Sequence, residues 1–182
     1  MLSGDRSTAL LRGSLDQAGF NTHGWGSEFN TVVSRETVAR VAQRLVDISD
    51  KTGQPVVVIG WSLGGLYARL LAHRMPEHVA LVATLGSPFS GDRHANNAWR
   101  LYEWLNDHKV DSPPFAEDIS KKPPVPTLAF WSPKDGVVAP ECARGEEDQC
   151  DMQIELLYRH FELGSSRRAI NEVLNCLRRA LA

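Results

Sequence analysis

The sequence predicts a single α/β domain in which a mostly parallel sheet is covered by helices on both faces. Two observations lead to this prediction. Helical and strand-like segments alternate along the chain, an order that favours parallel strands joined by helices. Two of the strand-like segments, Pro55–Ile59 and Val79–Leu85, are continuous apolar runs, as in strands buried on both faces. The length of 182 residues suits one domain spanning 1–182.

The first half of the chain contains two predicted helices and two predicted strands. Residues 7–18 place leucines on one helical face, and Phe20–Trp25 follows as a short strand. Ser34 is a candidate N-cap for a helix that ends near Gly53. The strand at Pro55–Ile59 comes next. A helix over residues 64–75, stopped by a proline, completes this half.

The second half begins with the strand Val79–Leu85 and continues into an insertion at about residues 89–126. Thr127–Trp131 and Met152–Leu157 are predicted to be two further strands. The final segment is amphipathic at helical spacing, with this apolar stripe: Ile170, Val173, Leu174, Leu177 and Leu181.

Composition and charge exclude several functional classes. Hydrophobic residues make up 42% and charged residues 23%, which is typical of a globular protein. The net charge is −2, so no general attraction to nucleic acid is expected. No apolar run approaches the roughly 20 residues of a membrane span. The expected partner is a small molecule, and the oligomeric state is left open.

The cysteines and the first residues bear on the cellular compartment. Three cysteines are an odd number, which disfavours a disulfide scaffold. Cys142 and Cys150 could bridge one short loop, but free thiols are expected. The first dozen residues carry Asp5, Arg6 and Arg12 and lack an apolar core of the kind found in a secretory signal. A cytoplasmic location is therefore expected.

The pattern G-x-S-x-G at residues 60–64 is the strongest functional signal. It directly follows a predicted buried strand and opens a predicted helix, which is the context that this motif requires. A turn of this kind presents the hydroxyl of Ser62 at the carboxyl edge of the sheet as a nucleophile. The backbone N–H of Leu63, at the start of the helix, is placed to stabilise an oxyanion. The alternative is a structural turn in which the serine is incidental.

A serine nucleophile needs a base and an acid that orients the base. Asp135 lies in a turn after the strand Thr127–Trp131, and His160 follows the next strand, so both fall at the edge that carries Ser62. Asp135 could instead be an ordinary turn residue before glycine. The acidic residues at 146–148 compete for its role, although their loop is polar and expected to be solvated. Glu162 is expected to be a loop carboxylate. The other histidines are less suitably placed: His23, His73, His78, His94 and His108.

No metal or cofactor is expected. The chain has no H-E-x-x-H, no paired C-x-x-C and no glycine-rich phosphate loop.

These motifs resemble those of compact bacterial α/β-hydrolases of the lipase and esterase type. The resemblance rests on residues 56–65 around the serine, 85–89 after the following strand, 131–138 at the acid, and His160. It implies the α/β-hydrolase fold, with Ser62 as nucleophile, Asp135 as acid and His160 as base. It also implies Leu63 as one oxyanion donor.

The chain departs from the family pattern at its start. In the family, a second oxyanion donor follows an earlier strand that lies beside the strand leading to the nucleophile. Here the chain begins where that loop should be, so Met1 or Leu2 would take the second oxyanion position. Two explanations fit this departure, a truncated start and a reduced hydrolase fold, and the first is favoured. A neighbouring strand would then be absent from the sheet.

The insertion at 89–126 lies where such enzymes carry a cap. Its aromatic residues, together with the tryptophan of the serine motif, could line an acyl pocket, or they could simply pack the cap onto the domain. The candidate substrate-binding residues are Trp61, Trp99, Tyr102, Trp104 and Phe115.

The function predicted from the sequence is hydrolysis of an ester or related acyl bond through a covalent acyl-enzyme. Two alternatives stay open. The same three residues could transfer an acyl group to an alcohol or thiol, or the fold could serve as a non-catalytic binding protein.

Overall fold

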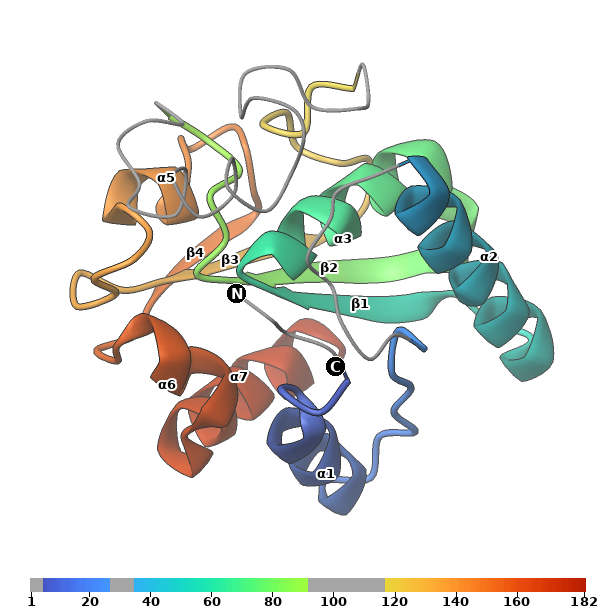
Figure 1. Cartoon of the computed structure of the whole chain (residues 1–182), viewed down its shortest axis with the longest axis horizontal. Coiled ribbons are helices and arrows are strands. Elements are labelled where there is room, and N and C mark those ends of the chain that lie inside the picture. The colour runs from blue at the N-terminus through green and yellow to red at the C-terminus, as the bar shows by residue number, and fades with distance from the viewer. Residues whose placement is uncertain (1–4, 27–34, 92–116) are drawn as a thin grey trace.

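The computed structural model describes residues 5–26, 35–91 and 117–182 (Figure 1). Its centre is a parallel sheet of four strands that pair in the order in which they occur along the chain. The strands are β1 (Val56–Trp61), β2 (Val79–Leu85), β3 (Thr127–Trp131) and β4 (Met152–Glu155). The predicted parallel α/β architecture is therefore confirmed.

Helices cover both faces of this sheet (Figure 1). One face is covered by α1 (Ala9–Gln17), α6 (His160–Ser165) and α7 (Arg167–Ala180). The other face is covered by α2 (Arg35–Thr52) and α3 (Leu63–Arg74). Two short helices, η1 (Pro76–His78) and α5 (Pro140–Arg144), complete the described elements.

The two faces of the sheet bury separate apolar layers. On the side of α7, Leu81 and Leu85 of β2 pack with Phe130 of β3 and with the apolar stripe of the helix. On the opposite side, Val58 and Val82 pack against α2 and α3. Successive strand residues point to opposite faces, so continuous apolar strands supply both layers at once. None of the helices in the described ranges is long and apolar enough to cross a membrane.

Most predicted elements are present, but the strand predicted at Phe20–Trp25 is wrong. This segment pairs with no strand among the described residues. Instead, side-chain carboxylates accept hydrogen bonds from part of its backbone. The Thr22 N–H donates to Oδ1 of Asp16 at 3.0 Å, and the Trp25 N–H donates to Oδ1 of Asp5 at 2.9 Å. Among the described residues, no strand lies beside this segment to pair with it.

Burial along β1 also differs from the prediction. The sequence predicts that β1 is buried on both faces, but Val56, Val57 and Ile59 are only partly buried. The reason is that β1 lies at the edge of the sheet and has β2 as its only strand partner among the described residues. At the other edge, β4 ends two residues earlier than predicted, and Leu157 is largely exposed.

The cysteines agree with the expectation from the sequence. Cys142 lies in α5 and Cys150 precedes β4, and both are buried and form no disulfide. Burial raises the pKa of the Cys150 thiol, which keeps it protonated at neutral pH.

Arg69 of α3 is a fully buried arginine that holds two loops together. Its Nε donates to the Ile119 carbonyl at 2.6 Å, and its Nη2 donates to the carbonyls of Lys121 at 2.8 Å and Gln149 at 2.9 Å. The guanidinium also lies 4.0 Å above the centre of the Phe89 ring. Burial lowers its pKa to about 10, so the group stays charged at neutral pH. A single side chain of α3 therefore connects the end of the insertion to the loop before β4.

We expect Arg69→Met to lower the free energy of unfolding by about 2–5 kcal/mol, because several buried carbonyls would lose their donor. The matched control is Arg74→Met, which removes a half-exposed ion pair with Glu117 (2.6 Å). That loss should cost only about 0–1 kcal/mol. Urea denaturation of both variants measures the difference. Equal losses of unfolding free energy in the two variants would show that the buried hydrogen bonds of Arg69 stabilise the fold no more than an exposed ion pair does.

Candidate active site

Ser62 occupies the sharp turn between β1 and α3. Its backbone has φ 55° and ψ −125°, and it is the single non-glycine residue with positive φ in the described part of the chain. Such a conformation costs a non-glycine residue about 1–3 kcal/mol. The turn is fixed by the Ser62 N–H, which donates to the Leu85 carbonyl of β2 at 2.9 Å. The strand-to-helix context predicted for the motif is confirmed.

Two glycines allow the helix to approach the strand closely at this turn. A Cβ on Gly60 would overlap the backbone of Gly64 and Gly65. A Cβ on Gly65 would overlap the hydroxyl of the buried Ser87, which itself donates to the Gly60 carbonyl at 3.3 Å. The close packing that forces Ser62 into its conformation is therefore possible only without these side chains.

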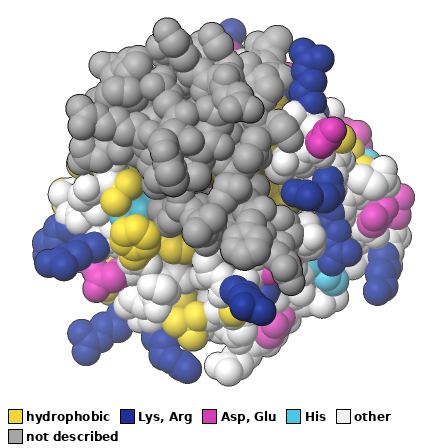
Figure 2. All heavy atoms as spheres, viewed as in Figure 1, with side chains coloured by type: hydrophobic (Ala, Val, Ile, Leu, Met, Phe, Trp, Pro, Cys, Tyr) yellow, Lys and Arg dark blue, Asp and Glu magenta, His cyan; other side chains and the backbone are white. Residues whose placement is uncertain are grey.

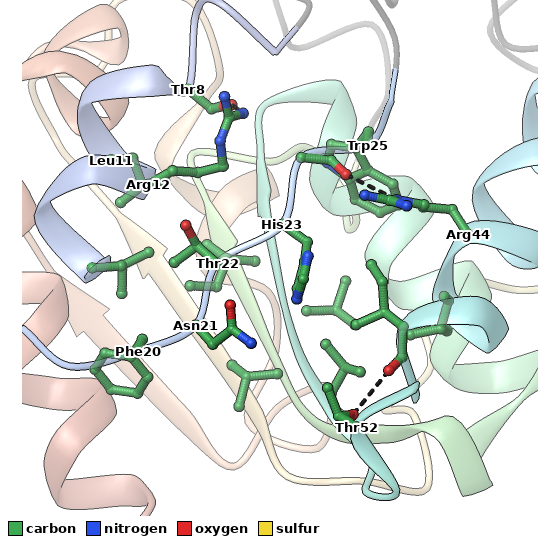
Figure 3. Close-up of a pocket in the computed structure, with 18 of the residues that line it drawn as sticks. Thr8, Leu11, Arg12, Phe20, Asn21, Thr22, His23, Trp25, Arg44 and Thr52 are labelled. Carbon is green, nitrogen blue, oxygen red and sulfur yellow. Dashed lines mark hydrogen bonds between the residues drawn. The ribbon is translucent and has the colours of Figure 1, made fainter. Parts of the chain in front are cut away.

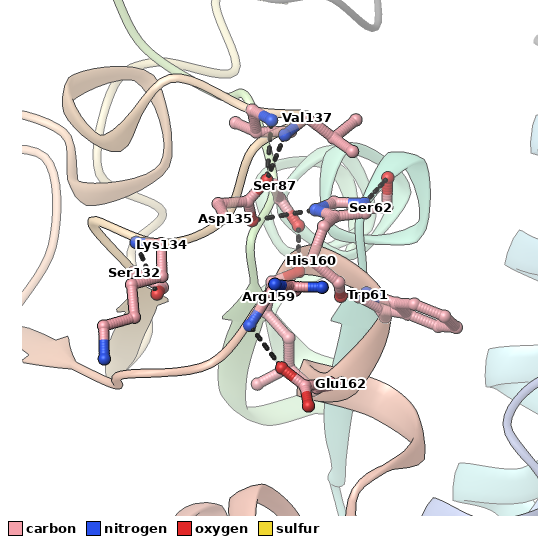
Figure 4. A network of polar contacts seen from close by, with 12 residues as sticks. Trp61, Ser62, Ser87, Ser132, Lys134, Asp135, Val137, Arg159, His160 and Glu162 are labelled. Carbon is pink, nitrogen blue, oxygen red and sulfur yellow. Dashed lines mark hydrogen bonds and ion pairs between the residues drawn. The ribbon is translucent and has the colours of Figure 1, made fainter.

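The three residues predicted for catalysis lie in one hydrogen-bonded row (Figure 4). Nε2 of His160 is 3.0 Å from Oγ of Ser62, and Nδ1 of His160 is 2.8 Å from Oδ2 of Asp135. A carboxylate only accepts hydrogen bonds, so Nδ1 carries the proton and Nε2 is free to accept from the serine hydroxyl. His160 and Asp135 are both buried, which shields their contact from water, while Ser62 is partly exposed.

The backbone around Asp135 fixes the direction of its carboxylate. Oδ1 accepts the N–H of Val137 at 3.0 Å and that of Val138 at 2.6 Å, which leaves Oδ2 for the histidine. The Asp135 carbonyl also accepts the N–H of His160 at 3.0 Å. The loop after β3 and the start of α6 are thus joined by both backbone and side chain.

Trp61 precedes the serine and supports the histidine from the other side. Its indole N–H donates to the His160 carbonyl at 3.1 Å, and its ring packs on Gly164 of α6. The centres of the Trp61 and Phe161 rings are 6.5 Å apart in an edge-to-face arrangement. A role of Trp61 in substrate binding stays a prediction, but its contacts place it as support for His160.

Gly86 is a site residue that the sequence reasoning did not single out. It has φ 53° and follows β2 directly beneath the buried pair of Asp135 and His160. A Cβ there would lie 2.8 Å from Oδ2 of Asp135 and 3.2 Å from Nδ1 of His160. A glycine that ends the strand next to the nucleophile strand is the signal that could have indicated it.

Of the residues predicted to bind the oxyanion, Leu63 lies within the described part of the chain. Leu63 is the first residue of α3, so its N–H is among those that a helix leaves without an internal acceptor. Met1 and Leu2 lie outside the described residues. The same is true of the predicted pocket aromatics Trp99, Tyr102, Trp104 and Phe115.

Within the described residues, the competing acids and histidines make no contact with the row. Residues 146–148 are exposed, as expected. Glu162 accepts the N–H of Arg159 at 2.8 Å and caps α6. His73 contacts the Lys121 carbonyl, far along α3 from Ser62. His94 and His108 lie outside the described residues.

A family model described as the alpha/beta hydrolase fold matches residues 15–112, more than half of the chain. The chain belongs to the α/β-hydrolase fold family. The match covers the turn with Ser62, while Asp135 and His160 lie beyond it.

Solved structures support this membership of the α/β-hydrolase fold. A structure of the metagenome-derived lipolytic enzymes LipS and LipT superposes with a TM-score of 0.68 at 14% identity, over 98% of this chain and 90% of that one. A methylesterase, MES16 from Arabidopsis, gives 0.66 at 12% identity, over 96% and 94%. A lipase-esterase related protein from Clostridium acetobutylicum gives 0.65 at 15%, over 94% and 89%. No curated protein matches the chain in sequence.

The strained turn at Ser62 of this α/β-hydrolase predicts that a glycine variant is more stable than an alanine variant. Ser62→Gly should be more stable than Ser62→Ala by about 1 kcal/mol, because both lose the hydroxyl and only glycine relieves the strain. Chemical denaturation of the two variants under identical conditions measures this. If the alanine variant were the more stable one, Ser62 could not be held in a strained conformation.

Gly86→Ala should displace the carboxylate of Asp135 or the imidazole of His160. A shift of about 1 Å in such a group is enough to lower a catalysed rate about a hundredfold. The rate at which an active-site-directed organophosphate labels Ser62 reports the effect.

Gly13→Ala in α1 is the matched control, since a Cβ at Gly13 meets nothing within 4 Å. It should label at the parental rate. Parental labelling in both variants would show that Gly86 does not position the pair.

Proposed function

We propose that this α/β-hydrolase cleaves an ester or related acyl bond through an acyl-enzyme formed on Ser62. The observation that carries the proposal is the uninterrupted row from the Asp135 carboxylate through His160 to the Ser62 hydroxyl, at 2.8 and 3.0 Å. These are the contacts by which a histidine withdraws a proton from a serine while a carboxylate holds its tautomer.

In the first step, Nε2 of His160 takes the hydroxyl proton as Oγ of Ser62 attacks the acyl carbonyl. The Asp135 carboxylate stabilises the resulting imidazolium and stays ionised. The imidazolium then returns the proton to the departing alcohol, and the acyl group remains bonded to Oγ. In the second step, water attacks this ester while His160 again accepts and returns the proton, which releases the acid and restores the serine.

Negative charge develops on the carbonyl oxygen during both attacks. The Leu63 N–H is the expected donor from this chain, because it stands at the N-terminus of α3 beside Ser62. A second donor at Met1 or Leu2 remains part of the proposal.

The activities named for structurally similar proteins support an ester substrate. Structures with this fold include a monoacylglycerol lipase from Paleococcus ferrophilus and a polyneuridine aldehyde esterase, in addition to the lipolytic enzymes and the methylesterase described above. The side chain after His160 is also apolar and open to solvent, since Phe161 is 54% exposed. An exposed apolar side chain in contact with the ring of His160 fits the acyl or alkyl part of an ester.

Hydrolysis of p-nitrophenyl butyrate tests the proposal. Ser62→Ala should abolish turnover, and Asp135→Asn should lower kcat by about 10⁴, because the histidine would lose its productive tautomer. Asp148→Asn removes the same charge from an exposed position and should hydrolyse at the parental rate. Activity that survives Ser62→Ala would contradict the proposal.

A further inference from the structure

Three aromatic rings contact one another at the catalytic row. The ring centres of Trp61 and His160 are 6.0 Å apart, those of Trp61 and Phe161 6.5 Å, and those of His160 and Phe161 5.7 Å. All three separations lie within the range of about 4.5–7 Å over which aromatic rings attract one another. Trp61 precedes Ser62 at the end of β1, and Phe161 follows His160 in α6. The rings therefore border both the nucleophile and the base.

The three rings differ in their exposure to solvent. His160 is fully buried. The Trp61 ring packs on Gly164, and its N–H donates to the His160 carbonyl at 3.1 Å. Phe161 is edge-to-face with both rings, at interplanar angles of 85° and 87°, and yet is 54% exposed. Figure 2 shows hydrophobic side chains gathered over the start of α6. A single exposed apolar residue is ordinary at a protein surface, but this one contacts the catalytic base.

The pocket between β1 and the segment Phe20–Trp25 is a separate feature (Figure 3). Of the described residues, those that line it include Ile59 of β1 but neither Ser62 nor Phe161. A group held against Phe161 therefore lies at the catalytic row and not in that pocket.

The proposed reaction places the two halves of an ester differently with respect to the histidine. After Oγ of Ser62 has bonded to the acyl carbon, the bond from that carbon to the alcohol oxygen breaks, and Nε2 of His160 gives this oxygen its proton. The alcohol oxygen must then lie within about 3 Å of Nε2, whereas the acyl chain stays on Oγ and needs no contact with the histidine. The alcohol half is therefore the part of the substrate closest to the rings that border His160.

Phe161 is placed where such an alcohol arrives. The Nδ1 side of the imidazole is closed, because Asp135 bonds to Nδ1 and a Cβ on Gly86 would lie only 3.2 Å from it. Phe161 lies on the side of Trp61, the residue next to Ser62, and Ser62 is itself partly exposed. An aromatic side chain there offers a large, rigid apolar surface to an incoming group.

We propose that Phe161 is a specificity-determining residue whose exposed ring binds the alcohol half of the ester, so that the preferred substrates are esters of ring-bearing apolar alcohols. The inference rests on the proposed hydrolysis at Ser62 and deepens it. A ring in the alcohol covers the open part of the Phe161 side chain and gains an aromatic contact in addition to the burial of apolar area. A methyl group is too small to do the same.

Two butyrate esters test the inference, because they differ only in the alcohol. Benzyl butyrate carries a ring and methyl butyrate does not, while both form the same butyryl-enzyme, so a difference in kcat/KM arises before the alcohol departs. The parent protein should prefer the benzyl ester. Phe161→Ala should lower kcat/KM about tenfold for benzyl butyrate and leave that for methyl butyrate nearly unchanged. Phe161→Tyr keeps the ring and should keep the preference.

The matched control is Met152→Ala. Met152 is 50% exposed, much like Phe161, but stands at the start of β4, the end of that strand away from the catalytic edge. Its truncation should leave the ratio of the two kcat/KM values as in the parent. A second control compares benzyl acetate with benzyl butyrate, which differ only in the acyl half. Their ratio should be the same in Phe161→Ala as in the parent.

Several results would overturn the inference while the proposed hydrolysis still stands. An equal loss for both butyrates in Phe161→Ala would show that Phe161 only supports His160. A changed ratio of acetate to butyrate would assign the ring to the acyl half, and unchanged rates with every ester would show that no substrate meets it. A folded parent protein that hydrolyses none of the esters would instead contradict the proposed function, and the inference with it.

Discussion

The strained backbone of Ser62 is the constraint on which the site depends. Its φ of 55° turns the chain from β1 into α3 in one residue, and the Ser62 N–H stays bonded to Leu85 of β2. The conformation persists because Gly60 and Gly65 let helix and strand meet at backbone distance. The packing of α3 against β1 and β2 offsets the energetic cost of this backbone conformation. The result is a hydroxyl held outside the helix and toward His160.

Parallel topology brings the other two side chains to the same place. Asp135 follows β3 and His160 follows β4, so both leave the sheet at the edge where β1 delivers Ser62. Loop geometry then fixes their orientation. Two backbone N–H groups fix the Asp135 carboxylate, and the Trp61 indole holds the His160 carbonyl. Asp135 is therefore positioned by its own loop, and His160 by the indole of Trp61 at the end of β1.

The parts of the fold that could be predicted are those with a strong local signal. β2 and β3 match their predicted bounds because each is a short apolar run closed by a turn. The order serine, aspartate, histidine along successive strands predicted which residues meet. Gly86 and the contact between Trp61 and His160 escaped prediction, because they depend on distances between elements that no local pattern encodes. The strand predicted at Phe20–Trp25 is wrong because a strand needs a paired neighbour, and this segment has none among the described residues.

The direct test of the account is whether the Ser62 hydroxyl is activated in the folded chain. The purified protein is incubated with a fluorophosphonate probe and its intact mass is measured, with Ser62→Ala as the control. The account predicts one covalent adduct, located on Ser62 by peptide mapping and absent from the variant. A folded protein that gains no adduct, or an adduct that persists in the variant, would contradict the claim that Asp135 and His160 activate this serine.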